Sequence, residues 1–285
     1  MNARVLVVGA SGAVGEAIAF EALERGCGVV AATRNVNSSA ARRLRKAGVN
    51  VAAADLSVRT SFTALLGSVD IAILVPPLTL SAAVAGEAAH VRAVFFSSNN
   101  VAIDLRSPIY RNLARAEDIV SASNSANVIL RPGLIYGDVR LPTIARLMQL
   151  ARRSPVLPMP GSGRARMQPV YHADLARIAV DAALDKSVTG VFGVGGPDIV
   201  AMRELYRAIG EAAGRRVIAA PVPKAFLRAA RAIGGELFPL DMAQISRADL
   251  DRVVRNPLPT RFAAKVSLRD GLRRLAEQFG YIKPA

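Results

Sequence analysis

Cysteine is nearly absent from this sequence, since Cys27 is the only one among 285 residues. A single cysteine excludes an internal disulfide, and the two histidines fall into no metal-ligand pattern, so we expect no metal site. The longest apolar run, 69–80, is interrupted by Asp70 and the Pro76-Pro77 pair and is too short to span a membrane. No signal-peptide cleavage site precedes the first strand-like run, and we therefore expect a cytoplasmic protein.

Aromatic residues are also scarce, at 5%, whereas the formal net charge of +15 is strongly one-sided. Residues 1–140 hold 14 Lys and Arg against 10 Asp and Glu, and residues 141–285 hold 23 against 12. Such a field attracts anions. The cations are scattered along expected helices without a nucleic-acid-binding motif. The alternatives that remain are an arginine-rich solvated surface and a phosphorylated or nucleotide-linked small-molecule substrate, and we predict no nucleic-acid partner.

The first 130 residues alternate between short β-branched runs and helix-like segments. We expect strands at 5–8, 28–32, 49–53, 70–75, 91–96 and 128–131, and helices at 14–25, 39–47, 59–66, 81–89 and 113–121. This alternation predicts an α/β fold of the Rossmann type, a doubly wound parallel sheet covered by helices on both faces. The strands are almost continuously apolar, as buried parallel strands are.

After residue 140 the alternation loosens, which predicts a second, smaller and mostly helical lobe. We expect a dinucleotide-binding domain at 1–140 and a C-terminal substrate lobe at 141–285, with 171–196 returning to the first domain. Helices are expected at 142–153 and 173–184 and a strand at 191–194. The basic amphipathic segment 222–233 is expected to pack within the lobe. The sequence is compatible with a monomer or a homodimer.

A glycine-rich loop follows the first expected strand and opens the first expected helix. It reads Gly9-Ala10-Ser11-Gly12-Ala13-Val14-Gly15. In this context Gly9 permits a tight turn, Gly12 lets the backbone approach a pyrophosphate, and Gly15 lets helix and strand pack closely. The helix N-terminus adds free N–H groups for the phosphates. We therefore expect Gly9, Ser11, Gly12, Ala13, Val14 and Gly15 to bind NADP or NAD.

The end of the second strand indicates which of the two dinucleotides is bound. A carboxylate there would favour NAD, but the strand ends in Thr33-Arg34-Asn35. The guanidinium of Arg34 suits a 2′-phosphate and favours NADP, with NAD as the alternative. Asp55-Leu56 and Val75-Pro76 close the third and fourth strands and are candidates to line the cofactor groove. Turn or capping roles are equally open for them.

Several motifs together resemble the atypical and extended short-chain dehydrogenase/reductase superfamily, in particular its NAD(P)-dependent epimerase/dehydratase members. Besides the glycine-rich loop and Asp55-Leu56, they are the stretches at 95–98 (FFSS), 129–137 (ILRPGLIYG) and 161–176 (GSGRARMQPVYHADLA). The resemblance covers residues 4–225. It implies that Ser97, Pro132 and Leu134 contact the cofactor. It also makes Tyr136, Arg164 and Arg166 candidates to contact the substrate, the arginines through a diphosphate. The alternatives are a packing role for Tyr136, which we favour, and solvated loop positions for the two arginines.

Members of this superfamily use a Tyr-x-x-x-Lys pair with a nearby hydroxyl, because a phenol of pKa near 10 needs an adjacent cation to exchange protons near neutrality. Here the pattern is damaged. Aligning Arg115 with the lysine leaves Tyr110 one residue early, and one residue turns a helix by about 100°. Asn99 takes the hydroxyl position, with Ser98 before it. The candidate catalytic residues are therefore Tyr110, Arg115, Ser98 and Asn99, with Arg115 also holding the nicotinamide ribose.

Two functions follow from the damaged pattern. The first is an NADP-dependent reductase or sugar-nucleotide epimerase/dehydratase-like enzyme with an atypical active site. The second is a non-catalytic NADPH-binding sensor or assembly subunit. No Gly-x-Ser-x-Gly elbow is present, which excludes the common hydrolase arrangement.

Overall fold

The computed structural model describes residues 3–223, 225–227, 229, 232 and 245–283. They divide into two compact units. Unit 1 consists of residues 1–132, 172–194 and 254–264, and unit 2 of 133–171, 195–253 and 265–285. The structure differs from the division expected from sequence in two segments: residues 133–140 belong to unit 2, and residues 254–264 belong to unit 1. The segment predicted as a basic amphipathic helix at 222–233 lies in part outside the described residues.

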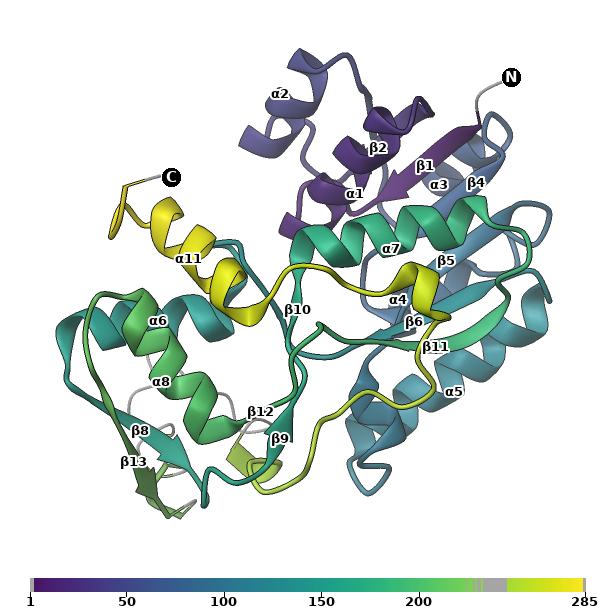
Figure 1. The fold of residues 1–285 in the computed structure, drawn as a ribbon. Helices are drawn as coiled ribbons and strands as arrows, with labels where there is room; N and C mark the ends of the chain where they lie inside the picture. The colour runs from purple at the N-terminus through teal and green to yellow at the C-terminus, as the bar shows by residue number, and fades with distance from the viewer. Residues whose placement is uncertain (1–2, 224, 228, 230–231, 233–244, 284–285) are drawn as a thin grey trace. The chain divides into compact units, whose positions relative to one another are not determined.

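Unit 1 is built on a seven-stranded parallel sheet with the order β11-β6-β5-β4-β1-β2-β3 (Figure 1). The strands are β1 (Arg4–Val8), β2 (Gly28–Thr33), β3 (Asn50–Ala53), β4 (Ile71–Leu74), β5 (Arg92–Phe96), β6 (Val128–Pro132) and β11 (Gly190–Val194). β1 lies between β2 and β4, so the strand order reverses beside it. The predicted Rossmann-type sheet is confirmed, and ligands of such sheets bind at this reversal, outside the carboxyl ends of the strands.

The helices of unit 1 cover both faces of the sheet. They are α1 (Ala13–Glu24), α2 (Ser39–Lys46), α3 (Arg59–Leu66), α4 (Leu78–Ser81), α5 (Pro108–Ser123) and α7 (His172–Leu184), with the 3-10 turns η1 (Ala82–Val84), η2 (Asn99–Ala102) and η4 (Thr260–Phe262). The single helix expected at 81–89 is wrong. Pro77 instead is the N-cap of α4, and hydrogen-bonded turns follow η1 at residues 85–90.

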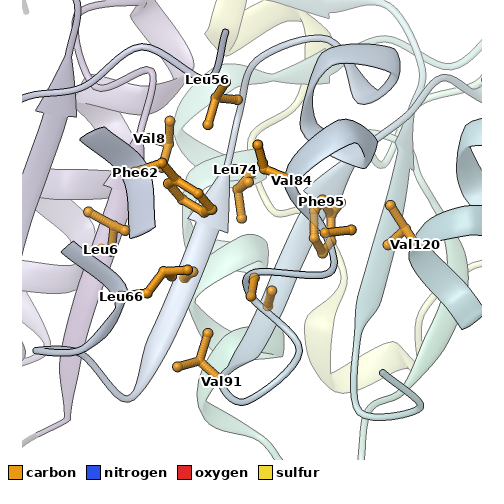
Figure 2. Close-up of a cluster of buried hydrophobic side chains, with 14 of the residues drawn as sticks. Leu6, Val8, Leu56, Phe62, Leu66, Leu74, Val84, Val91, Phe95 and Val120 are labelled. Atoms are coloured by element: carbon orange, nitrogen blue, oxygen red, sulfur yellow. The ribbon is translucent and has the colours of Figure 1, made fainter. Parts of the chain in front are cut away.

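One face of the sheet and helices α3 and α5 enclose a hydrophobic core of unit 1 (Figure 2). Successive strand residues point to opposite faces, so Leu6 and Val8 share this core and the residues between them face the other side. Phe62 of α3 is fully buried here, and Val120 brings in α5. On the other face α1 packs against α7 (Figure 1). The core holds the carboxyl ends of β1, β4 and β5 in fixed positions.

Two arrangements secure the edge of the sheet at β11. Residues 254–257 run beside it, where the Gly193 N–H donates to the Asn256 carbonyl (2.8 Å) and the Asn256 amide donates to the Val191 carbonyl (2.7 Å). Arg92, the first residue of β5, donates to the carbonyls of Ala182 and Ala183 as α7 ends, and also to those of Ala126, Asp185 and Val188. A cation at this helix C-terminus is favourable.

Within the described residues, unit 2 combines helices with short strands around a separate core. The elements are β7 (Ile135–Tyr136), α6 (Pro142–Arg153), β8 (Val156–Pro160), β9 (Arg166–Met167), β10 (Val170–Tyr171), β12 (Val200–Ala201), α8 (Met202–Ala212), β13 (Ile218–Val222) and α11 (Leu268–Gln278). The strands pair as β10 with β7, β12 with β9 and β13 with β8. In the described part of the chain, no helix has the length and apolar character needed to cross a membrane.

Candidate functional site

The glycine-rich loop joins β1 to α1 in unit 1. The N–H groups of Gly9 and Ala10 both donate to the Ala32 carbonyl, at 3.0 and 3.2 Å, and fasten the loop to β2. Gly9 has φ +81°, a conformation that favours glycine. A Cβ at Gly15 would lie 2.3 Å from the Gly9 carbonyl oxygen, so only glycine lets α1 pack this closely on the loop.

Gly12 differs from these two glycines because nothing within the described chain requires it. Its φ is −78°, which other residues adopt readily, and a Cβ there would meet only the Gly9 carbonyl oxygen, at an ordinary 3.5 Å. The residue is exposed and precedes α1 as its N-cap without a capping side chain. A missing Cβ on an open surface at a helix N-terminus is suited to close backbone approach by a phosphate.

The first turn of α1 presents unused hydrogen-bond donors at the same place. The first helical hydrogen bond runs from Glu16 N–H to the Gly12 carbonyl (2.9 Å). The preceding N–H groups, those of Ala13, Val14 and Gly15, have no backbone or side-chain acceptor among the described residues. Helix geometry leaves these groups free and gives this end partial positive charge. The loop therefore fits the pyrophosphate of a dinucleotide.

The loop after β4 lies beside the glycine-rich loop. The Val75 N–H donates to the Val8 carbonyl (3.2 Å), and the ring of Pro76 is 3.2 Å from the place where a Cβ of Gly9 would be. A hydrogen bond also holds Pro76 in place, because the Ser81 hydroxyl donates to the Pro76 carbonyl (3.2 Å). The structure thus brings together the predicted phosphate loop and the predicted Val75-Pro76 wall at the reversal of strand order.

The ends of β2 and β3 carry the residues expected near the adenosine. Arg34 is exposed and has no hydrogen-bond or ion-pair partner among the described residues. The Asp55 carboxylate accepts from the Ser57 N–H (2.9 Å) and hydroxyl (2.8 Å), and these bonds, aided by the charge of Arg34, lower its pKa. Leu56 is buried in the core of unit 1. Asp55 therefore closes a local turn beside Arg34, and Leu56 packs below it.

A buried ionic cluster lies at the ends of β5 and β6. Glu117 of α5 accepts from Arg131 Nε (2.8 Å) and Nη2, and also from the Ser97 hydroxyl (2.5 Å). The Glu117 side chain is only 5% exposed. Ser98 caps η2 by accepting from the Asn100 N–H (3.3 Å), and Asn99 is buried. Because the hydrogen of the Ser97 hydroxyl points to Glu117, its oxygen remains a hydrogen-bond acceptor for a ligand.

Helix α5 places the two central members of the predicted catalytic set on different faces. Tyr110 is buried and lies about 20° around the helix from Glu117, whereas Arg115 is exposed and lies about 140° from Tyr110. Leu113 and Ala114, one turn beyond Tyr110 on its face, are half-buried and uncharged. On α5, therefore, no cation is placed beside the phenol as the Tyr-x-x-x-Lys mechanism requires.

Of the remaining predicted site residues, Pro132 belongs to unit 1 and the others belong to unit 2. Pro132 ends β6. In unit 2, Tyr136 is 1% exposed and packs edge-on against Tyr171 (5.7 Å between ring centroids), so it is a core residue of this unit. Arg166 pairs with Asp251 (2.9 Å), whereas Arg164 is exposed with no ion-pair partner among the described residues.

Leu134 also belongs to unit 2, where its carbonyl accepts from the Val170 N–H (2.9 Å). Sequence reasoning singled out Ser97 but missed its two partners in the Ser97–Glu117–Arg131 cluster. Its members are up to 34 residues apart in sequence, and only the packing of α5 on the sheet brings them together. The spacing of a Glu on the helix and an Arg on the next strand was the available signal. Within the described residues, no group of three or more His, Cys, Asp or Glu could hold a metal ion.

Comparison with protein-family models matches residues 1–245 to the NmrA-like family. The chain belongs to the NmrA-like family. This agrees with the predicted superfamily and with the NAD(P)-binding Rossmann fold described above. A comparison with curated protein sequences finds no significant match.

Solved structures share the fold of this NmrA-like protein along its whole length. UDP-glucose 4-epimerase from Thermus thermophilus, in complex with NAD, is similar with a TM-score of 0.72 and 18% identity, covering 97% of this chain and 99% of that one. Pal from Bacillus thuringiensis is similar with a TM-score of 0.76 and 17% identity, with the same coverage. A dTDP-glucose 4,6-dehydratase from Bacillus anthracis, in complex with NAD, has a TM-score of 0.72 and 12% identity, covering 99% and 97%.

Proposed function

We propose that this protein binds NADP(H) at the carboxyl ends of the strands in unit 1, where the strand order reverses between β1 and β4. The observation that carries the proposal is Gly12, a glycine that neither backbone conformation nor packing requires. The free N–H groups of Ala13, Val14 and Gly15 would hold the pyrophosphate, and Ser11 and Pro76 would flank it. NAD is bound in the similar epimerase and dehydratase structures, which supports a nicotinamide dinucleotide as the ligand.

The preference for NADP over NAD rests on Arg34. It is exposed at the end of β2, where a carboxylate would be needed to accept from a ribose 2′-hydroxyl. A guanidinium pairs instead with the oxygens of a 2′-phosphate. Asp55 would contact the adenine side, through the oxygen that Ser57 does not occupy.

We propose further that binding is the function and that this protein acts as a sensor or as a subunit of an assembly. A bound nicotinamide would supply a hydride, but the reaction of the superfamily also needs a phenol whose pKa is lowered by a cation. On α5, the positions one turn after Tyr110 are Leu113 and Ala114, and Arg115 lies on another face. A guanidinium that cannot deprotonate is also a poor substitute for lysine in a proton relay.

A second candidate is an NADP-dependent reductase or sugar-nucleotide epimerase/dehydratase-like enzyme. Two observations favour it. Ser97 has its hydroxyl oriented by buried Glu117, which suits a group that fixes a ligand, and Arg164 is exposed and without an ion-pair partner among the described residues, which suits a substrate phosphate. A UDP-glucose 4-epimerase from Thermotoga maritima, similar in fold with a TM-score of 0.72 and 14% identity, was solved with UDP-glucose.

Calorimetric titration of the full chain with NADPH and NADH tests the binding proposal, with Arg34→Ala as the variant. We expect NADPH to bind more tightly than NADH, and Arg34→Ala to weaken NADPH by about tenfold while leaving NADH within twofold, since a charge-assisted phosphate contact contributes about 1.5 kcal/mol or more. Tighter binding of NADH to the native chain would contradict the role of Arg34. Binding of neither would contradict the proposal as a whole.

Deuterium transfer separates the two candidates. The protein is incubated with NADPH deuterated at C4 and simple carbonyl compounds, which detects a reductase. It is also incubated with NADP+ and UDP- or dTDP-sugars deuterated at the sugar C4, because an epimerase or dehydratase takes its hydride from the sugar. The sensor proposal expects no label in any product and no epimer or dehydrated sugar. Transfer that is lost in Tyr110→Phe would establish the enzyme instead, and transfer that persists in Tyr110→Phe would establish an enzyme that uses another proton donor.

A further inference from the structure

Two pairs of adjacent arginines precede two neighbouring strands of unit 2, and we call them the arginine pairs: Arg152-Arg153 before β8 and Arg215-Arg216 before β13. β8 and β13 lie side by side as parallel strands (Figure 1). The Ile218 N–H donates to the Pro155 carbonyl (2.8 Å) where the two segments enter these strands. Each arginine pair ends two residues before this hydrogen bond, so the backbone places both pairs at the same end of the two-stranded sheet.

Arg152 is the member of this group whose contacts fix its position. Its Nη1 donates to the Ala213 carbonyl (3.3 Å), two residues before Arg215, and its guanidinium lies over the ring of Tyr281 (5.5 Å to the centroid). That ring stacks on Phe279 (5.2 Å between centroids). Arg152 thus ties the end of α6 to the end of α8. A guanidinium held in this way loses little side-chain freedom when it binds a ligand.

The other arginines of the two pairs lack counter-charges. The side chains of Arg153, Arg215 and Arg216 are exposed and have no hydrogen-bond or ion-pair partner among the described residues. Residues 139–173 contain six arginines and no Asp or Glu. Unit 2 as a whole holds 20 Lys and Arg against 10 Asp and Glu. The guanidinium groups therefore remain available to the carboxylates or phosphates of a ligand.

The arginine pairs border two exposed aliphatic side chains, which we call the apolar pair: Val156 of β8 and Ile218 of β13. The two are register partners in parallel strands and therefore point to the same side of the sheet. Their exposed fractions are 43% and 67%, whereas the next residue of β8, Leu157, is fully buried in the core of unit 2. Parallel strands are normally covered on both faces, and an exposed apolar surface with a polar rim marks an interaction site.

We propose that the arginine pairs and the apolar pair together dock a segment of a partner protein that combines carboxylates with apolar side chains. The inference rests on the proposed function as a sensor or assembly subunit, and it names the chemistry of the partner. Guanidinium forks pair bidentately with carboxylates, and an apolar side chain of the partner covers Val156 and Ile218.

A protein segment fits this surface better than nucleic acid does. The four guanidinium groups are fewer than the roughly 6–10 phosphate contacts that DNA-binding surfaces make. The apolar pair also has no counterpart on a sugar-phosphate backbone, whereas it suits an aliphatic side chain between carboxylates. Charge and apolar character together therefore favour an acidic segment of a protein.

Fluorescence anisotropy of the full chain with labelled peptides tests the proposal. The probe is a peptide of Glu and Leu residues, with one control peptide that has Gln for Glu and another that has Ser for Leu. The variants are Arg216→Ala, the triple variant with Arg153→Ala and Arg215→Ala added, and Ile218→Ser. Arg269→Ala is the matched control, because Arg269 is an exposed cation of unit 2 at the start of α11, about 15 Å along that helix from its end near Tyr281.

We expect the Glu-Leu peptide to bind with an affinity that falls as salt is added, because exposed charge pairs are screened. Arg216→Ala should weaken binding by about threefold and the triple variant by about twentyfold, the range of exposed charge pairs. Ile218→Ser and the Ser-containing peptide should each lose about fivefold, since an aliphatic contact is removed. Arg269→Ala should stay within about twofold. Thermal unfolding checks that every variant folds.

Three results would overturn the proposal. The first is that the native chain does not bind the Glu-Leu peptide at low ionic strength, or binds the Gln peptide equally well. The second is an equal loss in Arg269→Ala and Arg216→Ala, which would reduce the surface to general attraction by a basic protein. The third is tighter binding of a DNA duplex than of the peptide, lost in the triple variant, which would assign the surface to nucleic acid.

Titration of the same native chain with NADPH keeps this surface distinct from the proposed cofactor site. A chain that binds the peptide but neither NADPH nor NADH refutes the cofactor proposal and leaves the docking surface in place. A chain that binds NADPH but not the peptide refutes the docking surface alone.

Discussion

The contrast between Gly12 and Gly15 gives the sharpest prediction for the phosphate loop. The two glycines lie three residues apart, yet a Cβ would meet different surroundings at each. At Gly15 it would lie 2.3 Å from the carbonyl oxygen of Gly9, 2.8 Å from its carbonyl carbon and 3.0 Å from the Cα of Ala10, all of them backbone atoms. At Gly12 the nearest atom is 3.5 Å away and the residue is exposed. Gly15→Ala therefore perturbs the fold, and Gly12→Ala perturbs the ligand site.

The magnitudes separate the two variants. Forcing a methyl group against backbone atoms costs about 1–3 kcal/mol or more, so Gly15→Ala is expected to lower the free energy of unfolding by at least 2 kcal/mol. Alanine is a poorer N-cap than glycine by about 0.5–1 kcal/mol. Gly12→Ala is therefore expected to lower the free energy of unfolding by no more than this amount. The new methyl group would, however, stand where a phosphate approaches the N–H groups. Losing one such charge-assisted hydrogen bond weakens binding by about tenfold to a hundredfold.

Chemical denaturation and calorimetric titration with NADPH measure the two effects side by side. The expected result is a Gly12→Ala protein with near-native stability and at least tenfold weaker binding, beside a clearly destabilised Gly15→Ala protein. Native-like NADPH affinity in a folded Gly12→Ala protein would refute the reasoning that Gly12 is kept open for a ligand. Gly12→Ser, whose side chain can cap the helix, checks that the loss of binding does not come from the cap.

Three further predictions concern other described contacts. Replacing Glu117 by Gln leaves the guanidinium of Arg131 without its counter-charge in a mostly buried site, and denaturation should show a loss of about 2 kcal/mol. Arg92→Met removes the donor to five backbone carbonyls and should cost about 3 kcal/mol or more by the same assay, a loss below 1 kcal/mol being contrary to the account. The hydrogen bonds from Ser187 and the contact with an arginine lower the pKa of Asp185 to about 2, so this stabilising contact is complete above pH 4 and is lost as the pH falls toward 2. Ser187→Ala should raise that pKa toward 3.8 in an NMR titration, and an unchanged value would contradict the assignment.

The parts of the fold that sequence reasoning predicted are those set by local pattern. Apolar β-branched runs predicted the seven strands of the sheet to within one or two residues, and the glycine spacing placed the turn from β1 to α1. Both signals lie within a few residues of the structure they specify. The resemblance to the extended short-chain dehydrogenase/reductase superfamily came from the same local motifs, and the family match agrees with it.

The parts that were not predicted depend on contacts between distant residues. Segment 254–264 joins unit 1 through hydrogen bonds of Asn256 to β11, more than 60 residues away in sequence. No local sequence pattern predicts that the chain comes back to unit 1 at this point. The Ser97–Glu117–Arg131 cluster needs α5 and β6 to be placed on the sheet first. For Tyr136, within the 129–137 motif, a packing role was favoured over a ligand contact, but the partner it packs against, Tyr171, depends on how unit 2 folds.

The central claim, that unit 1 binds NADP(H), is tested most directly by thermal unfolding of the full chain with and without dinucleotide. A ligand that binds the folded state stabilises it by about 2.7 kcal/mol at a concentration one hundred times its dissociation constant. The account predicts a higher melting temperature with NADPH and a smaller rise with NADH at equal concentration. An unchanged melting temperature with both dinucleotides at millimolar concentration would contradict it.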